Sequence, residues 1–177
     1  MGIPTRLSDT ATWPAGWQAF ATLSLTGLLV LAAGLLLYWI ERDVSRALLI
    51  PRFDALHMPG RPGAMAGWLP SLLHTMGFGL LTAAALPRRS AWRLGACAAW
   101  CVVNIGFEIG QHPALSAPLA DALLARAGEG PVTQALAAYF RQGRFDTRDI
   151  AATLGGALVA AALLAYLDRR RGVRHKA

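Results

Sequence analysis

The chain contains 177 residues, of which 55% are apolar and 15% are charged. Because soluble domains contain about 25% charged residues, this composition predicts a membrane protein and argues against a large soluble fold. The net charge of +7 would fit nucleic-acid binding. However, the sequence has no basic stripe with interleaved aromatic residues, so we expect no nucleic-acid partner.

Four apolar segments are long enough to cross the roughly 30 Å hydrocarbon core of a bilayer as helices. They are residues 17–40, 66–86, 91–110 and 150–167. The first contains no charged residue, and Tyr38 and Trp39 near its end are typical of a membrane–water interface. We therefore predict an all-α polytopic membrane protein with about four transmembrane helices, in one membrane domain that covers residues 1–177.

The segment 112–149, before the last apolar stretch, has a different pattern. Residues 116–128 and 131–143 show helical spacing of their apolar positions, and Pro131 suits the first position of a helix. Both stretches are too short and too polar to cross a bilayer. We expect them to form short interfacial helices that lie at the membrane surface.

The distribution of basic residues predicts the orientation. Four spans place both termini and the connection 87–93 on one side of the membrane, where nine basic residues fall in short segments. The opposite side has eight, spread over much longer segments. Because basic residues in short segments near the membrane favour the cytoplasm, we predict that both termini are cytoplasmic. The nine are Arg6, Arg88, Arg89, Arg93, Arg169, Arg170, Arg171, Arg174 and Lys176.

Polar residues follow one face of the third segment. Cys97, Cys101, Asn104 and Glu108 are separated by steps of four, three and four residues, and Gln111 continues this face. We interpret the two cysteines as reduced packing residues. A charged group at membrane depth costs roughly 2.5–3.5 kcal/mol on insertion scales, so Glu108 indicates either a ligand site or a structural ion pair with Arg144 or Arg148.

The stretch RFDTRD, residues 144–149, leads into the last apolar segment. Asp146 is suited to cap that helix, and Asp149 follows at capping-box spacing. In the predicted topology this stretch, the end of the third segment and His74 approach the same membrane face. The candidate ligand-binding residues of an outward-facing polar pocket are His74, Glu108, Gln111, Arg144, Asp146 and Asp149.

The sequence assigns no cofactor and no catalytic residue, and a membrane hydrolase or metalloenzyme is the least favoured class of function. His74 is the only histidine inside an apolar segment, and one histidine cannot supply both axial ligands of a haem. A metal site formed by His74, Glu108 and His112 is chemically conceivable, but there is no HExxH motif and the spacing is common. No Ser-His-Asp order or phosphate-binding loop is present, so no reaction is assigned.

In these elements the chain resembles the VanZ-like family of small bacterial integral membrane proteins. The family pattern has a histidine early in one span, E-x-x-Q at the end of another, and R-x-D-x-x-D before a last span with glycines. The corresponding stretches are LPSLLHTMGFGLL, FEIGQ and RFDTRDIAATLGG, which lie within residues 68–165. Pro70-Ser71 stand where the family often has Asp-Lys, Thr153 stands where it often has Asn, and the segment 112–143 is longer here.

The resemblance implies a protein of the bacterial cytoplasmic (inner) membrane with a role in the cell envelope. Some members of the family are linked to low-level tolerance of teicoplanin-type glycopeptides. Its partners would be membrane lipids, and the polar pocket would hold a lipid headgroup or a lipid-linked envelope component around Glu108. An alternative is an accessory or structural subunit of a larger membrane complex, in which other subunits are the partners and the polar residues form an interface.

Overall fold

The computed structural model describes residues 15–41, 67–87 and 89–174. These ranges form α1 (Ala15–Glu41), α2 (Leu69–Ala85), α3 (Ser90–Gly110), α4 (Pro113–Ala127), α5 (Pro131–Gln142) and α6 (Thr147–Arg174), and they contain no strand. The predicted all-α class is therefore confirmed for the described part of the chain. The parts of the predicted 1–177 domain at 1–14, 42–66, 88 and 175–177 lie outside the described residues. Tyr38 and Trp39 belong to α1, but their side chains are not described, so their predicted place at a membrane interface is not tested.

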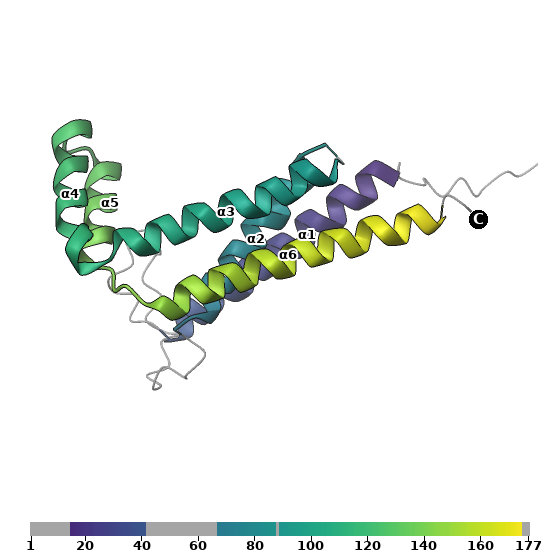
Figure 1. Ribbon diagram of the computed structural model, residues 1–177, viewed down its shortest axis with the longest axis horizontal. Coiled ribbons are helices and arrows are strands. Elements are labelled where there is room, and N and C mark those ends of the chain that lie inside the picture. The colour runs from purple at the N-terminus through teal and green to yellow at the C-terminus, as the bar shows by residue number, and fades with distance from the viewer. Residues whose placement is uncertain (1–14, 42–66, 88, 175–177) are drawn as a thin grey trace, which may run out of the picture.

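Four helices, α1, α2, α3 and α6, run along the long axis of the molecule, and α4 and α5 stand across it at one end (Figure 1). The start of α1, the α2–α3 connection and the end of α6 lie at the other end of the bundle. We call the end that carries α4 and α5 the hairpin end. Consequently, the end of α3 and the start of α6 lie close together in space although residues 111–146 separate them in the sequence.

Helix α2 is the centre of the bundle because it packs against α1, α3 and α6. Small residues let its neighbours approach closely. A Cβ atom added to Gly77 would lie 2.6 Å from Leu31 Cγ of α1, and one added to Gly27 of α1 would lie 2.8 Å from Leu81 Cγ. On α6, a Cβ atom at Gly156 would overlap the backbone of Leu72. Close contact at small residues is the usual basis of helix association in a membrane.

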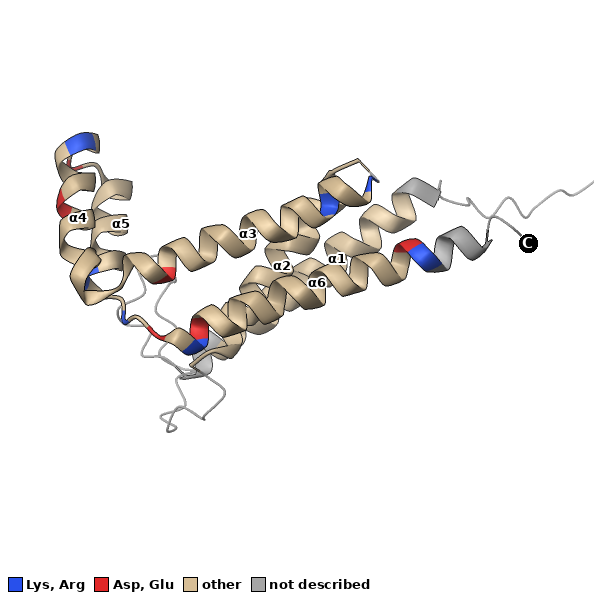
Figure 2. Cartoon of the chain, in the orientation of Figure 1, with Lys and Arg blue, Asp and Glu red and all other residues tan. Residues whose placement is uncertain are grey.

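The apolar core lies between α1, α2, α3 and α6, at residues Leu23, Leu80, Ala83, Ala84, Cys97, Ala160 and Leu164. Cys97 and Cys101 are free and buried, which confirms their interpretation as unpaired packing residues. Large apolar side chains also cover the outside of the bundle, where Leu29 of α1, Val102 of α3 and Leu158 of α6 are 62%, 70% and 70% exposed. The described charged residues gather near the helix ends and leave the middle of each long helix apolar (Figure 2). An apolar exterior of this extent is expected where lipid, rather than water, surrounds the helices.

Two helical stretches, Trp17–Leu37 and Thr147–Arg169, are long and apolar enough to cross a membrane. A third candidate is α3 together with α4, but this pair is bent by 100°. The described residues thus support two or at most three spans by length and composition, and the predicted count of about four is not confirmed. The shortfall has two causes: α2 has 17 residues and extends for only about 25 Å, and α3 contains Arg93 and Glu108.

A buried ion pair joins α3 to α6 at the end of the bundle opposite the hairpin. Arg93 Nη1 lies 3.3 Å from Asp168 Oδ1, and the side chains are 4% and 36% exposed. From the sequence, Arg93 was expected to be one of several basic residues that flank the membrane. The structure places it inside the bundle. Arg93 Nε is buried and has no hydrogen-bond partner in the described structure, so Asp168 is the main compensation for this charge.

We predict that Asp168→Ala destabilises the protein because it leaves a buried guanidinium without its counter-ion. Breaking a fully buried pair costs about 3–5 kcal/mol; because Asp168 is 36% exposed, we expect about 1–3 kcal/mol, seen as a lower thermal midpoint in detergent. Asp121→Ala is the matched control. It removes the acid of the Arg141–Asp121 pair, whose side chains are 45% and 67% exposed, and we expect an effect below about 1 kcal/mol. Equal midpoints for the two variants would contradict the structural role of Arg93.

Candidate functional site

The candidate site lies at the hairpin end, where α3 stops and α6 starts. Helix α3 ends at Gly110 because the chain turns directly into Pro113, and the ring nitrogen Nδ1 of His112 caps α4 by accepting the N–H of Ala114 at 3.3 Å. Helix α5 ends at Gln142, and residues 143–146 then lead back to α6. This geometry brings the E-x-x-Q and R-x-D-x-x-D elements to one end of the bundle.

Glu108 is the link between these two elements. Its side chain is buried, with 9% of the residue exposed, and Oε1 accepts the backbone N–H of Asp146 at 2.6 Å. Bonds from a neutral donor to a charged acceptor are among the stronger hydrogen bonds in proteins. The end of α3 therefore fixes the residue that begins α6.

Asp146 caps α6, as the sequence predicted. Its Oδ1 accepts the N–H of Arg148 at 2.9 Å, which satisfies one of the unpaired donors in the first turn. The spacing also suggested that Asp149 would complete a capping box by bonding the N–H of Asp146. That N–H instead donates to Glu108, so the acid comes from another helix.

Asp149 connects α6 to α2. It is 9% exposed, and its Oδ1 accepts the hydroxyl of Ser71 at 3.0 Å. The chain of bonds continues on α2, because Thr75 Oγ1 donates to the Ser71 carbonyl at 2.9 Å and accepts from Asn104 Nδ2 of α3, also at 2.9 Å. Glu108, Asp146, Asp149, Ser71, Thr75 and Asn104 thus form one polar cluster that joins three helices.

Sequence reasoning missed Ser71 and Thr75. They are one helical turn apart on α2, and both carry hydroxyl groups in a mostly apolar segment. That spacing was a usable signal, since hydroxyls on one face of a membrane helix usually bond across to a neighbour. Asn104 was placed on the correct face of α3 but was not named as a site residue.

Gln111 holds the linker 143–146 against α3. The residue is 8% exposed, and its backbone N–H bonds the carbonyl of Glu108 at 3.0 Å. Its side chain lies directly on Gly143, where an added Cβ atom would overlap the amide carbon and oxygen of Gln111. Gly143 is therefore required for this close approach.

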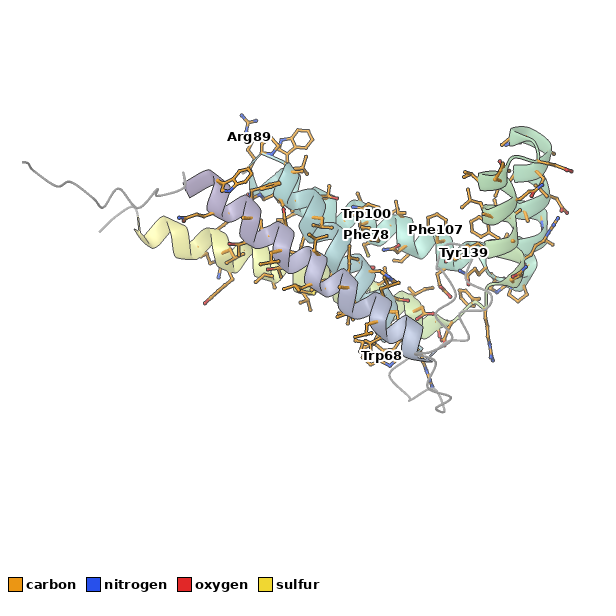
Figure 3. All side chains as sticks on the ribbon, turned by 180° about the vertical axis from the view of Figure 1, so that it is seen from behind. Trp68, Phe78, Arg89, Trp100, Phe107 and Tyr139 are labelled. Atoms are coloured by element: carbon orange, nitrogen blue, oxygen red, sulfur yellow. The ribbon has the colours of Figure 1, made fainter. Side chains whose placement is uncertain are left out.

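His74 lies apart from the polar cluster. Its ring stacks with Phe78 at 6.3 Å between centroids, and Phe78 stacks with Trp100 at 4.6 Å. A Cβ atom added to Gly34 would lie 3.9 Å from His74 Nε2, so the imidazole faces α1. In the described structure His74 makes no hydrogen bond, and the structure does not join it to Glu108. Figure 3 shows Phe78 and Trp100 together beside α1.

Arg144 and Arg148 are exposed, and the ion pairs that join described residues are Arg93–Asp168 and Arg141–Asp121. The pairing of Glu108 with Arg144 or Arg148 is therefore not among them. No group of three or more His, Cys, Asp or Glu side chains in the described ranges is placed to hold a metal ion. The polar cluster contains two buried carboxylates, those of Glu108 and Asp149. The linker beside them carries the exposed side chains of Arg144 and Asp146.

We predict that Gly143→Ala lowers the thermal midpoint, since the new methyl group forces Gln111 away from the linker. Overpacking of this kind costs typically about 1–3 kcal/mol. Gly130→Ala is the control: Gly130 has an ordinary backbone conformation, and its added Cβ would meet only Thr133 Oγ1, at 4.0 Å. Gln111→Ala in the Gly143→Ala background should recover part of the loss, and a Gly143→Ala variant as stable as the control would refute the contact.

The stretches on which the VanZ-like resemblance rests, FEIGQ and RFDTRD, are brought into direct contact by the Glu108–Asp146 bond. The family assignment nevertheless remains a prediction from those stretches. Comparison with protein-family models, with curated proteins and with solved structures finds no match for this chain.

Proposed function

We propose that this chain is a VanZ-like protein of the bacterial inner membrane that binds a lipid headgroup at the hairpin end. In this proposal α1, α2, α3 and α6 are four spans, both termini are cytoplasmic, and the hairpin end faces outward. The parallel course of the four helices supports four spans (Figure 1). Helix α2 is short, but α1, α3 and α6 surround it, so it depends less on contact with lipid than its neighbours do.

The observation that carries the proposal is the hydrogen bond between the buried Glu108 carboxylate and the Asp146 N–H. A carboxylate at this depth is costly, and such residues in membrane helices generally mark a functional site. Here it holds the linker 143–146 at the end of the bundle. The linker carries Arg144 and Asp146, exposed side chains of opposite charge two residues apart.

These charges suit a headgroup that contains a phosphate and a polar or cationic group. A guanidinium forms strong, bidentate hydrogen bonds with phosphate, which assigns the phosphate to Arg144. A lipid-linked envelope component offers the same phosphate chemistry. Glu108 would act by positioning the linker rather than by touching the headgroup.

Native mass spectrometry after gentle extraction tests this function. We expect a single chain that retains a lipid, with at least tenfold lower occupancy in Arg144→Gln because the phosphate contact is lost. Glu108→Gln should also lose lipid, because a neutral amide oxygen accepts the Asp146 N–H more weakly than a carboxylate and holds the linker less firmly. Because the bond itself remains possible, we expect less than about 1.5 kcal/mol of destabilisation. Arg126→Gln, at the far end of α4, is the matched control and should retain lipid.

Two outcomes would contradict the proposal. Lipid occupancy that is unchanged in Arg144→Gln would remove the phosphate site. A fixed stoichiometry with another protein, lost in Glu108→Gln, would favour the accessory-subunit alternative instead.

The orientation requires a separate test with reporter fusions. We expect a fluorescent protein fused after Ala177 to be bright and alkaline phosphatase at the same position to be inactive, because both termini are predicted to be cytoplasmic. Alkaline phosphatase inserted at residues 128–130, between α4 and α5, should be active. The reverse pattern would show that the hairpin end faces the cytoplasm.

A further inference from the structure

The two helices α4 and α5 form a hairpin with an unusual placement. They pack against each other and are connected through Gly128, whose φ of 75° favours glycine. The axis of α4 is bent by 100° from that of α3. The hairpin therefore projects sideways from the bundle, past α3, instead of continuing its direction (Figure 1).

Close contacts fix the hairpin to the end of α3. The ring of Phe107 lies 5.7 Å from that of Tyr139, edge to face, and 5.8 Å from that of Phe140, stacked. A Cβ atom at Gly110 would lie 2.5 Å from Phe140 Cε1 and 3.1 Å from Leu119 Cδ2. Figure 3 shows Phe107 and Tyr139 facing each other across this corner. These contacts identify the side of the hairpin that faces back along the bundle.

That side of the hairpin is apolar except near its tip, where Arg126 follows Leu119 by seven residues and so lies on the same face of α4. We call it the underside, and it consists of Leu115, Leu119 and Leu123 of α4 and Val132, Leu136 and Tyr139 of α5, at helical spacing on each helix. Val132, in the first turn of α5, is 74% exposed, and Leu115 and Tyr139 are 46% and 44% exposed. A single exposed apolar residue would need no explanation, but a continuous row of them does.

The opposite side of the hairpin is polar. Asp121 of α4 and Arg141 of α5 form an ion pair there, and Gln134 lies on the same side of α5. The hairpin is thus amphipathic, with its apolar side directed along the bundle and its charged side directed away from it.

We infer that the hairpin is embedded in the headgroup region of one leaflet, with its underside against the acyl chains of lipids beside α3. This inference rests on the proposed role of α3 as a span. If α3 crosses the bilayer, a helix at 100° to it lies close to the membrane plane. The face of α3 that meets the hairpin at Phe107 is also apolar and exposed: Phe107 is 37% and Val103, one turn earlier, 44% exposed. One lipid phase then covers both surfaces, as expected for an amphipathic element at an interface.

Site-directed spin labelling in proteoliposomes tests this placement. Single cysteines would replace Val132 on the underside, Gln134 on the polar side of the same helix, and Leu158 on the outside of α6 as a depth reference. Cys97 and Cys101 would be replaced by Ala. We expect the labels at 132 and 158 to collide more often with oxygen than with an aqueous nickel chelate, and the label at 134 to show the reverse.

The three labels separate the ways in which the inference can fail. A label at 132 that is as accessible to the nickel chelate as the one at 134, with 158 still in lipid, would overturn the hairpin placement but not the membrane span. A label at 132 that neither reagent reaches would show that protein covers the underside. A label at 158 that is exposed to the chelate would overturn the span itself, and the hairpin placement with it.

A second measurement does not depend on replacing the native cysteines. Val132→Asp and Gln134→Asp introduce the same charge on opposite sides of α5 in the otherwise native chain. In lipid nanodiscs we expect Val132→Asp to lower the thermal midpoint by several degrees and Gln134→Asp to leave it nearly unchanged. Equal shifts would overturn the inference.

Discussion

The arrangement of the hairpin end depends on one hydrogen bond, from the Asp146 N–H to the Glu108 carboxylate. It determines where α6 begins relative to the end of α3. Asp149 is only one turn further along α6, so the same bond brings it within reach of Ser71 on α2. A hydrogen bond to a charged group contributes about 1.5–3 kcal/mol, and a buried carboxylate without donors would cost more than that. The three helices are therefore held in register by polar groups at the hairpin end.

At the opposite end of the bundle, charged side chains rather than a backbone N–H join the helices. Arg93 and Asp168 join α3 to α6 through an ion pair, and the apolar core lies nearby at Ala84 and Leu164. Helices α3 and α6 are thus tied by charged residues at both ends and by small residues and cysteine between them. Because apolar side chains gain little from contact with each other rather than with lipid, these polar ties give the pair a specificity that the apolar contacts alone would lack.

The sequence pattern was informative about features that are local. The helical segments, the cap at Asp146 and the polar face of α3 all depend on spacing along one stretch of chain, and the structure agrees with them. Pairing between helices was harder to predict, because spacing does not tell which neighbour a face meets. For that reason the contact of Asp149 with Ser71 was not foreseen, and Arg93 was taken for a flanking charge. His74 was grouped with Glu108, although its ring stacks on Phe78.

The short linker 143–146 has a mechanical consequence. Gln111 contacts the first residue of the linker and Glu108 bonds the last, so both ends of the linker are fixed between α5 and α6. The hairpin is likewise fixed to α3 by Phe107 and Gly110. The hairpin and the bundle are therefore joined rigidly at one corner, beside Gly110. A displacement of the far tip, near Gly128, would therefore alter the contacts of Phe107 and the Glu108–Asp146 bond together.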